Sequence, residues 1–426
     1  MKPTESLMKT GVEFSRIIVG AVFVFSGFVK MVDPLGFTYK IQDYLTAWAL
    51  QGFSTLALPV AVGLSMLEFL LGAFILLGIY RRWAAMLIFV LMLFMTPFTL
   101  WIAIKNPVKD CGCFGDALII TNWETFYKNS VLVVLSAVLC FRWKRVYPLF
   151  SGRFQWAPAV FSMVFALLFS LYNVFRMQVF DFRPYKTGAS ISEQMRVDPD
   201  KADVYRNLFI YEKDGKKQEF TEENYPWNDS TWTFVEMKTD LVKKGENPKI
   251  EDFQIFRLSR DPASGQYVEE DDLTHEILSD SSYTFLMTSY SLGEADKSSA
   301  KSLNRIAGLA KKHGIPFYCL TSSVPDAISK WAEATAAEYT FCNADERVLK
   351  TINRSNPGLM LLKNGRVINK WDRFSIPGDK KLEKQLSRQD EASKPNNTLV
   401  LLLIMAIFLL PLGFLKWLEG RLIKDK

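Results

Sequence analysis

The amino-acid sequence predicts a membrane α-helical protein that carries a soluble α/β region, and the placement of its apolar residues is the main reason. These residues gather before about residue 180 and again after about residue 397, and the segment between is polar and charged. With 426 residues the chain is long enough for several domains. Its net charge of +6 is small, and its basic residues lie beside the apolar runs, which is typical of membrane proteins and not of nucleic-acid binding.

Six apolar runs approach or reach the length of about 17–25 residues that crosses a bilayer. They are residues 14–32, 56–79, 83–104, 126–141, 156–175 and 399–415. The fourth and sixth runs are short, and Pro411 interrupts the sixth. The first run is longer than a signal-peptide core and lacks a small-residue cleavage site, so we expect it to be retained as a membrane span.

The distribution of basic residues predicts the orientation of these spans. Basic residues occur before or within the start of the first span, between the second and third, between the fourth and fifth, and after the last: Lys2, Lys9, Arg16, Arg81, Arg82, Arg142, Lys144, Arg145, Arg153, Lys416, Arg421, Lys424 and Lys426. If the spans alternate, all of these segments share one side, which the positive-inside rule predicts to be the cytoplasm of a bacterial inner membrane. The periplasmic side then receives the loops with Lys40, Cys111 and Cys113 and the whole soluble region, and this compartment permits disulfides.

The soluble region is expected to have two parts. Residues 181–245 are predicted to be β-rich, because Asp214-Gly215 forms a turn signal between alternating segments. Residues 246–394 show strand and helix patterns in alternation and end in a hairpin with an Asn364-Gly365 turn. The expected domains are therefore residues 1–150 for the first four spans, 151–180 for the fifth span, 181–245, 246–394, and 395–426 for the last span and a basic tail.

The second soluble part resembles the thioredoxin-like fold in its β-α-β-α-hairpin order, with Pro357 opening the hairpin. In that family the corresponding proline is cis and faces the active site. Thioredoxins carry Cys-x-x-Cys after the first central strand, but residues 288–294 here contain no cysteine, so the resemblance implies a non-catalytic domain. Cys319 and Cys342 are either small buried hydrophobic residues or a disulfide, and together with Pro357 they are candidates to face a partner.

Cys111 and Cys113 are the candidate redox residues of the membrane part. They lie one residue apart in a loop between two spans, and Gly112 permits the tight turn that a small disulfide ring needs. Strain in such a ring makes the bond oxidising and easily exchanged. A structural disulfide and a permanently reduced turn are the alternative interpretations. Zinc is not expected, because two thiolates without a nearby histidine leave its coordination shell incomplete.

Charged residues beside this motif are expected to affect its thiols. Asp110 and Asp116 flank the pair and are predicted to raise the thiol pKa, unless Lys105 or Lys109 compensates. Such a rise would slow attack by either cysteine, because the thiolate is the nucleophile.

Glu68 is the candidate functional carboxyl within the spans. It lies near the middle of the second span, where a carboxyl is costly and usually has a partner or a function. Arg16 or Lys30 on the first span could pair with it. Its role is either to accept a proton during quinone reduction or to hold two helices together.

Several motifs of the membrane part point to a known family. The first span reads Arg-Ile-Ile-Val-Gly at 16–20 and Ser-Gly-Phe-Val-Lys at 26–30, the second reads Leu-Glu-Phe-Leu-Leu-Gly at 67–72, and the loop reads Cys-Gly-Cys-Phe-Gly at 111–115. Residues 16–141 thus resemble the DoxX family and its relative, the methylamine-utilisation protein MauE. The resemblance implies a four-helix membrane bundle with thiol or sulfur redox chemistry. With the attached thioredoxin-like domain, the whole is similar to an architecture of Bacteroidetes membrane proteins.

Two functions follow as hypotheses. In the first, Cys111, Cys113 and Glu68 are catalytic in an inner-membrane oxidoreductase that transfers electrons between periplasmic protein thiols and a quinone, which the resemblance alone implies. Arg16 and Lys30 would then help bind the quinone. In the second, the protein is a non-enzymatic scaffold or assembly factor whose thioredoxin-like domain binds an envelope partner. A transporter is less favoured, because the spans show no clear internal repeat.

Overall fold

A computed structural model describes residues 3–108, 110–201, 204–243, 245, 247–263, 265–387 and 396–424. Lys2, Lys109 and Lys426, which entered the expectations above, and the boundary expected at 394 and 395 lie outside the described residues.

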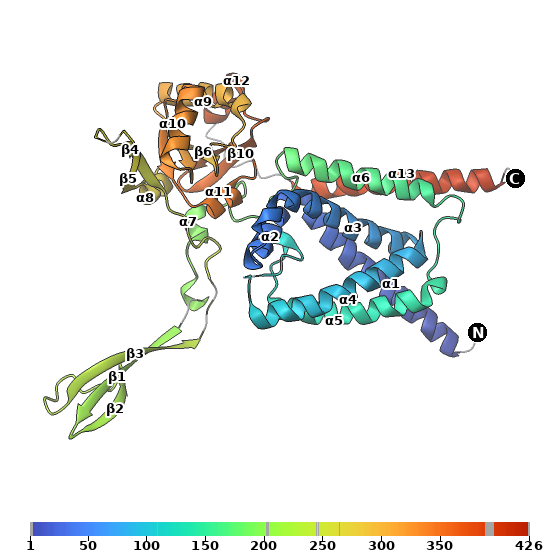
Figure 1. The fold of residues 1–426 in the computed structure, drawn as a ribbon, viewed down its shortest axis with the longest axis horizontal. Helices are drawn as coiled ribbons and strands as arrows, with labels where there is room; N and C mark the ends of the chain where they lie inside the picture. Colours follow the sequence, from blue (N-terminus) through green and yellow to red (C-terminus); the bar gives the residue numbers. More distant parts are fainter. Residues whose placement is uncertain are drawn as a thin grey trace.

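Six helices of the described chain are long and apolar enough to cross a membrane. They are α1 (Pro3–Val32), α3 (Ala57–Leu77), α4 (Arg81–Lys105), α5 (Asn122–Arg142), α6 (Trp156–Phe175) and α13 (Asn397–Lys424). The protein is therefore a multi-pass membrane protein, as the apolar runs predicted. The two chain ends lie at one end of these helices, and the soluble parts lie at the other (Figure 1).

Two details of the spans differ from the prediction. Helix α1 begins at Pro3 instead of near residue 14, and the added turns contribute Val12 to the bundle core. Helix α13 is continuous although Pro411 lies inside it. Proline is tolerated in membrane helices, where neighbouring groups satisfy the freed backbone.

The first four membrane helices share one core. Val19, Ile75, Ile88 and Leu139 represent α1, α3, α4 and α5 in it, and all four are fully buried. Helix α1 crosses α3 so closely that a Cβ added at Gly27 would lie 2.3 Å from the backbone nitrogen of Phe69. Small residues permit such close approach of membrane helices.

The last two spans pack together on this bundle. In Figure 1, α6 and α13 run beside each other, and they are joined by ring contacts such as Phe165 to Phe408, with centroids 4.8 Å apart. Phe408 also contacts Phe69 of α3, at 5.4 Å.

A short helix that the sequence analysis treated as a loop lies at the soluble end of the bundle. Helix α2 (Pro34–Ala47) follows α1 directly and includes Lys40. Asp33 caps it by accepting a hydrogen bond from the Gly36 amide at 2.9 Å, and Pro34 occupies its first turn. Asp before Pro is a typical helix-start signal. Short 3₁₀ segments elsewhere are η1 (Gln51–Leu56), η2 (Gly115–Ala117), η3 (Trp143–Arg145), η4 (Pro199–Lys201) and η5 (Lys297–Ser299).

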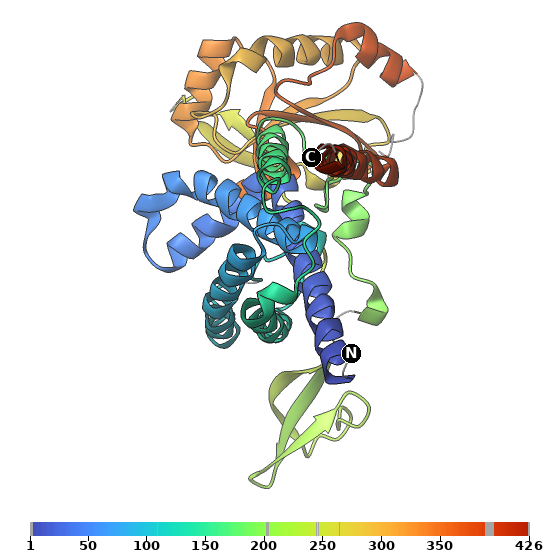
Figure 2. The same ribbon diagram turned by 90° about the vertical axis from the view of Figure 1, so that its right-hand side faces the viewer.

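The β-rich part forms a separate arm. Its strands are β1 (Val204–Lys213), β2 (Lys216–Thr221) and β3 (Thr233–Lys243), in the antiparallel order β2-β1-β3. The Asp214-Gly215 turn joins β1 to β2, and both turn residues have positive φ, as a tight hairpin requires. The arm projects away from the remaining structure, and the two views agree on this (Figures 1 and 2).

The second soluble part has a thioredoxin-like fold. Its elements, preceded by α7 (Ile191–Gln194), are β4 (Phe256–Arg260), β5 (Tyr267–Asp272), α8 (Thr274–Ser279), β6 (Tyr283–Ser289), α9 (Ala300–Lys312), β7 (Phe317–Thr321), α10 (Pro325–Thr335), β8 (Thr340–Asn343), α11 (Glu346–Ile352), β9 (Gly358–Lys363), β10 (Arg366–Asp372) and α12 (Asp379–Ser387). The sheet order is β10-β9-β6-β7-β8-β4-β5, with β6 parallel to β7 and antiparallel to β9. The bond between Asn356 and Pro357 is cis, as the resemblance implied.

Cys319 and Cys342 occupy opposite faces of this sheet. In the register of β7 with β8, Cys319 pairs with Phe341 while Cys342 pairs with Leu320, so the two cysteines are offset by one residue. Because neighbouring residues of a strand point to opposite faces, the two side chains lie in separate cores. Both are free thiols with no exposed surface. Of the two interpretations of these cysteines, the structure agrees with small buried hydrophobic residues and contradicts a disulfide. Pro357 is buried as well, so none of the three candidates exposes a surface to a partner.

Candidate functional site

Cys111 and Cys113 form a close dithiol in the loop between α4 and α5. Their Sγ atoms are 3.0 Å apart, and both cysteines are free thiols. Gly112 has φ of 70°, a left-handed conformation suited to glycine, and its amide donates to Asp110 Oδ1 at 2.9 Å. Since a disulfide needs about 2.05 Å between its sulfurs, a small movement within the loop closes the bond.

A buried ion pair lies next to this loop. Lys30 Nζ donates to both carboxylate oxygens of Glu68, at 2.7 and 2.8 Å, and the two residues are 5% and 7% exposed. The expected cation partner of Glu68 is thus Lys30. Arg16 is not at this site: it lies 14 residues earlier on α1, about 21 Å away along the axis, where it contacts Glu13 and the Tyr147 carbonyl.

Ser26 connects the ion pair to the dithiol loop. Its Oγ lies 2.7 Å from Glu68 Oε2 and 2.9 Å from the carbonyl oxygen of Cys113. No sequence motif singles out Ser26, although it precedes Lys30 by four residues and therefore shares its helix face. The structure thus brings Cys111, Cys113, Glu68 and Lys30 together, with Ser26 between them.

The two thiols have unequal acidity. The hydrogen bond between the two sulfurs, with Lys128 and Lys30 nearby, lowers the pKa of Cys113 to about 6. The same hydrogen bond, together with burial, raises the pKa of Cys111. Cys113 is therefore the better nucleophile at neutral pH.

The predicted effect of the flanking acids is wrong for Cys113. Asp110 is paired with Lys40 at 3.1 Å, and Asp116 points to Arg354 at 3.5 Å, so cations partly neutralise both carboxylates. The compensating cations near the thiols are Lys128 and Lys30 rather than the expected Lys105. Lys128 also lies over the Phe114 ring, 4.2 Å from its centroid.

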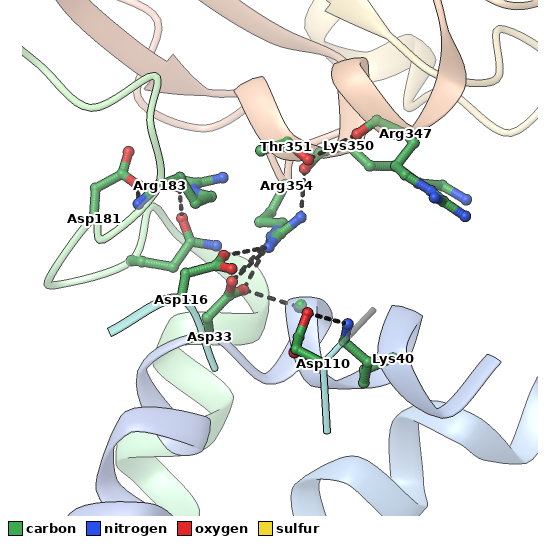
Figure 3. Close-up of polar contacts among 12 residues, drawn as sticks. Asp33, Lys40, Asp110, Asp116, Asp181, Arg183, Arg347, Lys350, Thr351 and Arg354 are labelled. Carbon is green, nitrogen blue, oxygen red and sulfur yellow. Dashed lines mark hydrogen bonds and ion pairs between the residues drawn. The ribbon is translucent and has the colours of Figure 1, made fainter. Parts of the chain in front are cut away.

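The thioredoxin-like domain contacts this site through Arg354. Its guanidinium donates to both oxygens of Asp33, with Nη2 2.7 Å from Oδ2, and also reaches Asp116 (Figure 3). Although burial opposes it, the Arg354 charge holds the pKa of Asp33 below its usual range, while burial raises the pKa of Asp116. Arg354 lies three residues before Pro357, so the proline loop of this domain faces the dithiol loop.

A small cavity with polar and apolar lining residues lies between the two domains at this point. Its volume is about 80 Å³, and its lining includes Lys30, Asp33, Gly112, Arg183 and Arg354. Pockets for drug-sized ligands usually measure about 300–1,000 Å³, several times the volume of this cavity. The quinone that the resemblance implies therefore does not fit this cavity.

The comparison with protein families supports the membrane assignment. Residues 8–142 match the family described as Methylamine utilisation protein MauE, so α1 to α5 contain a MauE-family domain. Residues 205–244, which form the β arm, match a domain of unknown function, DUF8463. No curated protein matches the chain.

Solved structures resemble the soluble part at low sequence identity. A putative protein disulfide isomerase from Bacteroides thetaiotaomicron is 11% identical, with a TM-score of 0.24, and the match covers 34% of this chain and 89% of that chain. The C-terminal domain of a putative thiol-disulfide oxidoreductase from the same organism is 13% identical, with a TM-score of 0.24, and the match covers 32% of this chain and 93% of that chain. A peroxiredoxin-like protein from Aquifex aeolicus is 10% identical, with a TM-score of 0.23, and the match covers 33% of this chain and 85% of that chain. The thioredoxin-like assignment rests on the strand order described above.

Proposed function

We propose that this protein is a membrane-bound thiol–disulfide oxidoreductase whose Cys111–Cys113 pair exchanges disulfides with a partner protein. The observation that carries the proposal is the unequal dithiol, with sulfurs 3.0 Å apart and the Cys113 pKa lowered to about 6. A reactive thiolate beside a second thiol is the arrangement that exchange requires.

The exchange can be written with all atoms and electrons balanced. The Cys113 thiolate attacks a partner disulfide, forms a mixed disulfide and releases one partner thiolate. Cys111 then passes its proton to that thiolate and attacks Cys113 Sγ, which releases the second partner sulfur. The pair is oxidised by two electrons and the partner disulfide is reduced, and the reverse sequence oxidises a partner dithiol.

The surrounding residues position this pair and do not react. Ser26 and the Lys30–Glu68 ion pair hold the loop against α1 and α3 through the Cys113 carbonyl. Because the cavity does not fit a quinone, no step here uses one. A lipid-borne quinone as the final electron acceptor stays a prediction, which the experiment below tests by adding quinone.

The location is part of the same proposal. We place the protein in a bacterial inner membrane with both termini cytoplasmic and the soluble domains periplasmic. The basic segments support this orientation, because they flank the helix ends opposite the soluble parts.

A non-enzymatic scaffold is the second candidate. It is favoured by one observation, the thioredoxin-like domain that keeps the fold while its two cysteines are buried and apart. In that case the Cys111–Cys113 pair would only close its loop.

Single-turnover exchange separates the two candidates. The full chain, oxidised in detergent, is mixed with a reduced Cys-x-x-Cys peptide, and new protein thiols are counted with and without added quinone. The proposal predicts two thiols at Cys111 and Cys113, and loss of exchange in Cys113→Ser. Cys140→Ser, which removes a cysteine on α5 outside the pair, is the control and should exchange normally. No exchange in the wild-type chain would favour the scaffold.

A further inference from the structure

The thioredoxin-like domain is joined to the membrane domain by a polar contact between two helices. We call this contact the docking seam, and its residues are Asp33, Tyr39, Asp43 and Asp116 on the membrane side and Arg347, Lys350 and Arg354 on the other. Arg347 and Lys350 lie three positions apart on α11 and share a helix face, and Arg354 follows two residues after the helix ends at Ile352.

The partners of these three residues follow in the opposite chain order, on α2 and at its N-cap residue Asp33. Arg347 lies 3.9 Å from Asp43, Lys350 lies 4.8 Å from the Tyr39 ring centroid, and Arg354 binds Asp33. Figure 3 shows the Arg354 side chain reaching from the soluble domain to Asp33 and Asp116. These three contacts pair specific residues in a defined order, so the seam is more than a general attraction between opposite charges.

The same seam includes the dithiol loop. Asp116 follows Cys113 by three residues, and Arg354 Nη2 reaches both its carboxylate and that of Asp33. One guanidinium thus ties the soluble domain to α2 and to the loop that carries the thiols. Any rearrangement of this loop changes a contact that holds the domain in place.

The sulfur atoms are only partly accessible in this arrangement. Cys111 is 7% exposed and Cys113 is half-buried. A partner protein must bring its own sulfur into line with one of them, and the docked domain reaches the same loop through Arg354, which contacts Asp116. Exchange with a protein therefore requires that the sulfurs become more exposed than they are in the docked form.

The contacts of the docking seam are polar, and buried polar atoms beside it are incompletely paired. The cavity beside it has a mixed lining, and among the described residues Arg183 Nη1 and Gln178 Nε2 are buried there without a hydrogen-bond partner. Polar, incompletely paired contacts between domains resemble transient interfaces, which separate more readily than large apolar ones.

We propose that the docking seam is a latch that holds the thioredoxin-like domain closed over the Cys111–Cys113 loop, and that its opening admits the partner protein. The latch rests on the proposed function for its purpose, since it controls access to the pair. The latch itself is tested on reduced thiols, because it only determines how easily a large reagent reaches Cys111 and Cys113.

Paired labelling rates test the latch. The reduced full chain, in a Cys140→Ser background, reacts either with N-ethylmaleimide or with a maleimide on a large polymer, and mass spectrometry resolves the labelled sites. The ratio of the two rates cancels any change in thiolate fraction. Asp116→Asn and Arg354→Lys weaken the seam, and Asp379→Asn and Arg305→Lys make the same changes in an ion pair outside it.

The latch predicts a higher bulky-to-small ratio in both seam variants, by roughly tenfold for a lost charge-assisted contact. It also predicts a rise with salt in the wild-type chain and no change in the controls. An unchanged ratio in Asp116→Asn and Arg354→Lys would overturn it, including the case in which both reagents speed up equally. If the ratio responds but the peptide exchange fails, the latch stands and the proposed chemistry does not.

Discussion

Arg354 and Asp33 form an ion pair between residues 321 positions apart, with Nη2 2.7 Å from Oδ2 and both oxygens engaged. Asp33 caps the helix that follows the first membrane span, and Arg354 precedes the cis proline of the thioredoxin-like domain. This pair fixes where the soluble domain meets the membrane domain, and it does so beside the dithiol.

The first prediction concerns pH. Because the pKa of Cys113 is lowered to about 6, its thiolate fraction rises through pH 6 and is nearly complete at pH 7.5, whereas an ordinary thiol near pKa 8.5 is mostly protonated there. We expect the labelling rate of Cys113 by N-ethylmaleimide to be half-maximal near pH 6. Cys111→Ala removes the hydrogen-bond partner of the Cys113 sulfur and should move this midpoint upward. A midpoint above pH 8 in the wild-type chain would show that Cys113 is not activated.

The second prediction concerns Lys128. Its ammonium is one of the charges that favour the Cys113 thiolate. Lys128→Met should move the labelling midpoint upward by about 0.5–1 pH unit, a modest shift for one nearby charge. Lys144→Met, which removes a lysine beyond the far end of α5, is the matched control and should leave the midpoint in place. Equal midpoints in both variants would contradict the role given to Lys128.

The third prediction concerns the buried ion pair. Lys30→Met alone leaves Glu68 buried without its cation, and breaking such a pair typically costs about 3–5 kcal/mol. The double variant Lys30→Met with Glu68→Leu removes both charges and should recover much of that loss. Chemical or thermal unfolding in detergent measures both. If the double variant is no more stable than the single one, the pair is not coupled as the geometry indicates.

The fourth prediction concerns helix packing. Gly27→Ala places a Cβ against the α3 backbone at Phe69, and overpacking of this kind costs about 1–3 kcal/mol. At Gly63, also within a span, an added Cβ meets nothing within 4 Å. Gly63→Ala should therefore be neutral or slightly stabilising. Similar unfolding midpoints for the two variants would contradict the close α1–α3 crossing.

Local signals in the sequence were enough for much of this fold. Apolar run lengths predicted the six spans, the Asp214-Gly215 turn predicted the first hairpin, and alternating patterns with Pro357 predicted the thioredoxin-like order. Each of these depends on residues close together in the chain. The close pairing of Cys111 with Cys113 is local in the same sense.

Other features depend on contacts that no local pattern contains. The β7–β8 register, which separates Cys319 from Cys342, follows from how two strands align. The contributions of Ser26 and Lys128 appear only when α1, α5 and the loop meet. The Asp33–Arg354 pair requires the docking of two domains, and α2 was missed because its start signal stood beside a span and its apolar content is modest.

The redox state of Cys111 and Cys113 is the measurement that tests the central claim most directly. Membranes containing the full chain are equilibrated across a dithiol–disulfide buffer series, free thiols are alkylated, and the remaining cysteines are reduced and labelled differently for mass spectrometry. The account predicts that the two cysteines change state together at mild potentials while Cys319 and Cys342 stay reduced. A Cys111–Cys113 pair that keeps one state across the whole series would contradict it.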